Sequence, residues 1–164
     1  MLLPIEQLSI STIENVRPGC LLWSVGGSER TLFWILESEA SRVALFLSGD
    51  YTWQGFRIGD GARWPGVQIG PVEVRVDLTS AHDGRTGARG NLVASEGALV
   101  LFVKLDRGGF SETVPVRLAD MKTLEVGSLH FKQWTLGMSQ DGKWIDLVTI
   151  KDGAIGGPLV SAIS

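Results

Sequence analysis

The residue types with the clearest chemical potential are concentrated in one polar stretch, residues 79–91. It contains His82, Asp83, Arg85 and Arg89, together with three glycines. A histidine can act as a general acid or base, and two arginines beside exposed glycine amides can bind an anion. Such loops often carry function because a rigid sheet holds them at its rim. The competing interpretation, which the polarity of the stretch favours, is a solvated hairpin tip.

A second group of candidates combines aromatic rings with arginine. Most of the six tryptophans are expected to pack in the core. Trp53 and Trp64 differ because polar residues, arginines and turns surround them. An aromatic ring beside arginine can stack on a sugar, a base or a partner's side chain. We predict a binding patch made of Trp53, Phe56, Arg57, Arg63 and Trp64, with a solvated, structural surface as the alternative.

The sequence argues against several other kinds of site. Residues 84–90 are rich in glycine but lack the Gly-Lys-Ser/Thr ending and the following helix of a phosphate-binding P-loop. Two histidines and one cysteine are too few for a closed zinc site, and no run of alternating acids marks a calcium loop. No pair of acids is placed as a glycosidase requires. We therefore predict neither a metal site nor a cofactor.

Short apolar runs must position these residues, and each run ends at Gly, Pro, Asp or Asn. About ten strand candidates recur at intervals of roughly 10 to 15 residues. Residues 72–78 alternate most cleanly, with apolar side chains on one face and charged ones on the other. Residues 43–47 and 98–103 are apolar on both faces and are expected at the centre of a sheet. Pro115 favours an edge position or a bulge, rather than a central position, for the strand around it.

Helical structure is expected only as single turns. Ser11 to Glu14 could form a capping box, and residues 119–125 could form one turn. A parallel α/β fold is excluded because its crossovers need helices that the sequence lacks. We predict an all-β fold, a single antiparallel β-sandwich or barrel that spans residues 1–164.

Composition narrows the expected partners and location. Lys and Arg number 15 against 18 Asp and Glu, so no overall positive field favours nucleic acid. A lone cysteine, Cys20, fits a reducing compartment. The N-terminus does not resemble a secretory signal, and no run approaches the roughly 20 apolar residues of a membrane span. We predict a cytoplasmic protein that does not enter a membrane.

The predicted function is a non-catalytic binding or assembly module that uses an aromatic and arginine-bearing loop surface. A protein partner or self-association is the main expectation, and a small ligand or carbohydrate is a further one. One alternative is an enzyme with His82 as acid or base, assisted by Asp83, Arg85 or Arg89. Another is a structural subunit of a larger assembly.

Overall fold

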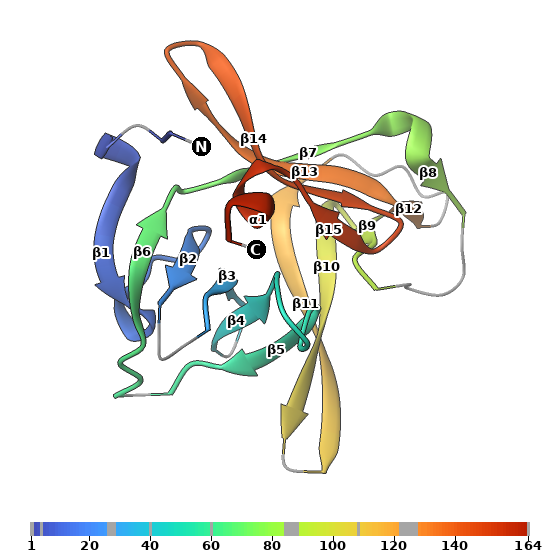
Figure 1. Cartoon of the computed structure of the whole chain (residues 1–164). Helices are drawn as coiled ribbons and strands as arrows, with labels where there is room; N and C mark the ends of the chain where they lie inside the picture. The colour runs from blue at the N-terminus through green and yellow to red at the C-terminus, as the bar shows by residue number, and fades with distance from the viewer. Residues whose placement is uncertain are drawn as a thin grey trace.

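The protein is built almost entirely from β-strands arranged in two sheets, as the computed structural model shows (Figure 1). This confirms the predicted all-β class. The sheets do not close into a barrel, since β1 and β8, the two ends of the larger sheet, do not pair with each other in the described part of the chain. The structure describes residues 2–3, 5–25, 29–39, 41–59, 61–83, 89–107, 109–121 and 128–163.

The larger sheet has eleven strands. In spatial order they are β1 (Leu8–Thr12), β6 (Pro65–Ile69), β2 (Leu21–Ser24), β3 (Thr31–Glu37), β4 (Arg42–Phe46), β5 (Gln54–Arg57), β10 (Ala98–Arg107), β9 (Leu92–Ser95), β12 (Leu129–Phe131) and β8 (Ala81–His82), with β11 (Phe110–Asp120) paired to β10. One pair in this sheet, β5 with β10, is parallel. The prediction of a purely antiparallel fold is therefore wrong at that pair.

The smaller sheet has four strands in the order β15 (Ala154–Gly156), β14 (Lys143–Lys151), β13 (Gln133–Gln140) and β7 (Glu73–Val76). It lies across β10 in Figure 1, while the β10–β11 hairpin extends beyond it. The chain ends in the short helix α1 (Pro158–Ile163), which contacts β14. None of the helices in the described ranges is long and apolar enough to span a membrane.

The two sheets share one apolar core. Leu21 and Trp34 come from the larger sheet and pack in the same cluster as Trp134 and Leu147 of the smaller sheet. A second cluster, which includes Phe33 and other residues of β2 to β4, lies on the opposite face of the larger sheet. Strands buried on both faces read as continuous apolar runs, which explains the sequence of residues 43–47.

The expected helical turns are only partly present. Ile13–Asn15 forms a short 3-10 turn near the predicted capping box, but the Thr12 side chain caps no backbone N–H group there. Two further 3-10 turns are Ile5–Gln7 and Leu78–Ser80. The predicted turn at 119–125 is wrong for its first two residues, which belong to β11, and residues 122–125 lie outside the described residues.

The position of Pro115 agrees with its chemistry. This residue lies in β11, which pairs along its length with β10 and with no other strand in the described part of the sheet. Proline lacks the N–H group that a central strand needs, so the edge position predicted from the sequence is confirmed.

Candidate functional site

Two tryptophans fix the turn that enters β9, residues 89–91. The Nε1 atom of Trp134 donates a hydrogen bond of 2.6 Å to the carbonyl oxygen of Gly90. Trp53 packs its ring against Gly90 so closely that a Cβ atom there would lie 2.5 Å from Cζ2 of the ring. The Nε1 atom of Trp53 in turn donates a hydrogen bond of 2.7 Å to the carbonyl oxygen of Gly153. These contacts hold the turn against the core.

The larger sheet divides beside this turn. One edge of β10 pairs with β9 over residues 98–101 and with β5 at Lys104 and Leu105. Between these two pairings the partner strands separate, and a cavity of about 190 Å³ lies at the fork. We call this cavity the fork pocket. It is lined by Trp53, Gln54, Arg89, Gly90, Asn91, Phe102, Lys104 and Thr113.

Strand register places three polar residues in one row at the fork pocket. Lys104 is opposite Thr113 of β11 on one side and opposite Gln54 of β5 on the other. Side chains directly opposite each other in neighbouring strands lie on the same face of a sheet. The Lys104 ammonium group therefore has a hydroxyl and an amide as its neighbours in the row.

The fork pocket presents hydrogen-bond donors and positive charge. Arg89 and Lys104 are exposed, and the described lining contains no carboxylate. Asn91 is only 5% exposed, and its Nδ2 donor has no hydrogen-bond partner among the residues that the structure describes. Buried donors are nearly always partnered in folded proteins. A set of donors and cations without an acid is suited to an oxyanion.

The sequence-predicted residues Trp53 and Arg89 both line the fork pocket, although they come from different predicted sites. Trp53 is not a surface ring as predicted, because it is 8% exposed and packs in the core. Its backbone φ of +71° allows the indole to turn inwards at the start of β5. Trp64 is not part of the fork pocket.

Phe56 and Trp64 instead belong to an aromatic cluster on the face of the larger sheet that is opposite the main core. Their ring centroids are 5.4 Å apart, and both rings contact Phe33. Phe46 and Tyr51 extend the cluster. Tyr51 is 60% exposed and Trp64 is 49% exposed. We call Phe46, Tyr51, Phe56 and Trp64 the aromatic face.

Arg57 points away from the aromatic face. Adjacent residues of a strand have side chains on opposite faces, which separates Arg57 from Phe56. Arg57 donates a hydrogen bond to Ser41 and forms an ion pair of 3.4 Å with Glu112. Arg63 is exposed. The five residues predicted as one patch are therefore distributed over separate surfaces.

His82 lies in β8, where it is paired with the other histidine of the chain, His130 of β12. Their ring centroids are 5.5 Å apart. Burial, and then the charge that His82 can carry, lower the pKa of His130 below its ordinary value. Asp83 is exposed after the end of β8. Arg85, the remaining candidate of this stretch, lies outside the described residues.

Two further titratable groups have shifted pKa values. Burial raises the pKa of the Cys20 thiol, against a smaller opposing effect of Arg17. Cys20 is therefore held as a neutral thiol in the core. The pKa of Asp77 is lowered because its Oδ1 atom accepts hydrogen bonds from the hydroxyl and the backbone N–H of Thr79. Asp77 thus caps the turn that leads to β8.

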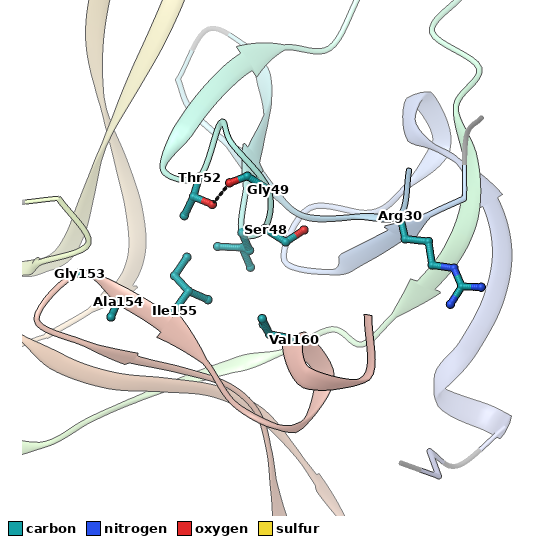
Figure 2. A pocket seen from close by; sticks show the side chains of 9 residues that line it. Arg30, Ser48, Gly49, Thr52, Gly153, Ala154, Ile155 and Val160 are labelled. Atoms are coloured by element: carbon teal, nitrogen blue, oxygen red, sulfur yellow. Dashed lines mark hydrogen bonds between the residues drawn. The ribbon is translucent and has the colours of Figure 1, made fainter. Parts of the chain in front are cut away.

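A second cavity, of about 450 Å³, lies between the end of β4 and the segment that forms β15 and α1 (Figure 2). Ile155 and Val160 line one side of it. Figure 2 shows Arg30 pointing away from Ile155 and Thr52, and the Thr52 hydroxyl already donates a hydrogen bond of 2.6 Å to the Gly49 carbonyl oxygen. Ser48 also lines this cavity, and its hydroxyl oxygen accepts a hydrogen bond of 2.9 Å from the Leu32 backbone N–H.

A third, open groove of about 700 Å³ lies over β9, β10 and β11. Its floor includes the apolar residues Val100, Phe102 and Pro115, and its rim carries four glutamates and two arginines. Arg57 is paired with Glu112, and Arg117 is paired with Asp120 at 2.7 Å. The mixed charge of the rim selects no single class of ligand.

Most residues of the fork pocket were not among the sequence candidates. Gln54, Asn91, Phe102, Lys104 and Thr113 come from four segments that only the sheet brings together. Asn91 ends the polar stretch that contained Arg89, so proximity in the sequence could have identified it. The other four sit in ordinary strand patterns with no local signal.

Comparison with known proteins gives one assignment. No curated protein matches the chain, and no solved structure matches it either. Residues 10–156, which make up most of the 164-residue sequence, match the model of a family described as uncharacterised protein y4lG. The chain therefore belongs to the y4lG family of uncharacterised proteins.

Proposed function

We propose that this protein is a non-catalytic binding module that holds the oxyanion of a small ligand in the fork pocket. One observation carries the proposal: Arg89 and Lys104 line a cavity together with Asn91, whose Nδ2 donor is buried without a partner among the described residues. An unsatisfied buried donor costs about 1–3 kcal/mol, and an oxyanion acceptor removes that cost.

The chemistry of the lining favours a carboxylate or a phosphate group. Arginine donates parallel hydrogen bonds to either anion, and lysine adds a positive point charge. Trp53 and Phe102 provide apolar contact beside these groups. Because a water molecule accounts for about 30 Å³ of liquid, a cavity of about 190 Å³ has room for an oxyanion and a few attached carbon atoms.

Calorimetric titration with inorganic phosphate, phenyl phosphate and benzoate tests this proposal and distinguishes a phosphate ligand from a carboxylate ligand. We expect one of the aromatic probes to bind more tightly than inorganic phosphate, because its ring also contacts the apolar lining. In Lys104→Glu we expect that affinity to fall about tenfold, which corresponds to about 1.4 kcal/mol. The affinity is also expected to decrease with added salt.

Lys143→Glu is the matched control. Lys143 is exposed at the start of β14 in the smaller sheet, and its substitution changes the net charge by the same amount. We expect it to leave probe binding nearly unchanged. Equal losses of affinity in Lys104→Glu and Lys143→Glu would show that only the overall charge matters, and would reject the fork pocket as the site. Absence of binding by all three probes would reject the proposal itself.

We also propose a protein partner for the aromatic face, namely a second copy of this chain. Tyr51 and Trp64 expose large rings, and these rings contact Phe46 and Phe56 respectively. Exposed apolar surface of this kind is typical of protein contacts. We expect sedimentation analysis to show concentration-dependent association that is reduced in Trp64→Ser. Leu78→Ser is the control, because Leu78 is 75% exposed in a 3-10 turn. A mass that stays monomeric, or an equal effect of both variants, would contradict self-association through this face.

Further proposals concern the arrangement of the sheets, the cellular location and the partners. We infer that the two sheets with their shared core form an open sandwich, and that Cys20 as a lone thiol reflects a cytoplasmic location. Two alternatives from the sequence are retained, an enzyme that uses His82 and a structural subunit of a larger assembly. A protein partner is proposed for the aromatic face, and nucleic acid is disfavoured by the net charge of −3.

A further inference from the structure

The only two histidines in the chain are brought together by strand pairing. His82 of β8 is directly opposite His130 of β12, although a long stretch of sequence separates them. His130 is also opposite Val93 of β9. The next row along these strands consists of Ala81, Phe131 and Leu92, and the last two belong to the main core. Both histidines therefore point to the face of the sheet away from that core.

The separation of the two rings matches a shared metal ion. A metal–nitrogen bond of about 2.0–2.1 Å places the ion about 3.2 Å from the centre of an imidazole ring. Two rings on one ion therefore have centres about 4.5 Å apart when the N–metal–N angle is about 90°, and about 6.4 Å apart when it is about 180°. The observed distance between the His82 and His130 centroids is 5.5 Å, and the rings are tilted by 55°. The observed separation lies within the range that a shared ion allows.

One ring nitrogen of each histidine, Nδ1, lacks a hydrogen-bond partner in the described part of the chain. His130 is 6% exposed, and the Nδ1 atoms of both histidines are enclosed without a hydrogen-bond partner among the described residues. Buried polar atoms of this kind call for a partner, and a metal ion is one that both rings can share.

We infer that His82 and His130 form a binding site for a late first-row divalent transition metal, with Cu²⁺ bound more tightly than Ni²⁺ or Zn²⁺. Imidazole nitrogen suits these ions, and the order follows the general ranking of their complexes. The described residues provide no group of three or more metal-binding side chains. Water or a further ligand therefore completes the coordination. This site uses none of the residues of the fork pocket.

Equilibrium dialysis of the untagged, full-length protein against Cu²⁺, Ni²⁺, Zn²⁺ and Mg²⁺ salts tests the inference. We expect Cu²⁺ to bind at one ion per chain, Ni²⁺ and Zn²⁺ to bind more weakly, and Mg²⁺ not to bind. His82→Asn and His130→Ala are each expected to weaken Cu²⁺ binding by more than about tenfold. Cys20→Ser should leave it unchanged, because that thiol is buried elsewhere in the core.

Electron paramagnetic resonance of the Cu²⁺-loaded wild-type protein gives a second readout that does not depend on how the variants fold. We expect nitrogen couplings from two imidazole rings. His82 is half-buried in the edge strand β8, so His82→Asn removes one ligand with the least disturbance of the core. Cu²⁺ affinity that is equal in the wild type and both histidine variants, or a spectrum without imidazole nitrogen, would overturn the inference.

Discussion

Replacement of Trp134 by alanine is expected to lower the free energy of unfolding by about 3–5 kcal/mol, as for other large buried aromatic side chains. Trp134 is 2% exposed, and its ring centroid lies 5.9 Å from that of Trp34 and 6.1 Å from that of Trp53. It also supplies the hydrogen bond to the Gly90 carbonyl oxygen. The variant loses ring packing and that hydrogen bond together. Urea denaturation followed by circular dichroism measures the loss.

Two further variants separate these contributions. Trp134→Phe keeps most of the apolar volume but leaves the Gly90 carbonyl without its donor, which costs about 1–3 kcal/mol. It should also weaken binding of the oxyanion probes, because Arg89 and Asn91 flank the carbonyl that Trp134 holds. Trp64→Ala is the matched control, since that ring is 49% exposed and should cost much less. Equal destabilisation by Trp64→Ala and Trp134→Ala would contradict the role given to Trp134.

Gly90→Ala is expected to destabilise the protein by about 2–5 kcal/mol, from two sources. The backbone φ of +76° is unfavourable for a residue with a side chain, at about 1–2 kcal/mol. The new Cβ atom would also lie 2.5 Å from the Trp53 ring, which a hydrogen bond to Gly153 holds in place. Forcing extra volume into a packed site typically costs about 1–3 kcal/mol. Thermal and urea denaturation measure the total.

Gly142→Ala isolates the backbone contribution. Gly142 has nearly the same φ, +74°, but a Cβ atom there would have no other atom within 4 Å. We expect this control to cost only the conformational part, about 1–2 kcal/mol. If both alanine variants lost the same stability, the contact between Gly90 and Trp53 would not constrain the turn. The placement of Arg89 and Asn91 in the fork pocket would then lack its structural basis.

The strands were predictable because their signals are local. Residues 72–78 alternate in polarity, and β7 exposes Glu73 and Arg75 while Val74 and Val76 pack towards the core. The pattern is wrong at Leu78, which is 75% exposed in a 3-10 turn because β7 ends at Val76. The run at 129–136 carries the same alternation, which by itself indicates a single strand. In the structure it is two strands, β12 and β13, which belong to different sheets. A polarity pattern shows which face is buried, but it does not show which sheet buries it.

The candidate site was predictable only in fragments. Arg89 was identified because arginines and glycines share a polar stretch, and Trp53 was identified because Arg57 and polar residues surround it. Neither signal could show that Trp53 turns inwards, because its positive φ depends on the core space that receives the ring. Lys104 and His130 lie in strands whose sequence does not reveal their cross-strand neighbours.

The sequence by itself determined the class of secondary structure, the edge position of Pro115 and the absence of a long helix from the predicted elements. These properties depend on neighbouring residues, through strand periodicity, backbone donors and turn preferences. Tertiary structure alone decided the parallel pairing of β5 with β10, the fork pocket beside it and the contact between His82 and His130. Such pairings depend on how the whole chain buries its apolar surface, which no single segment specifies.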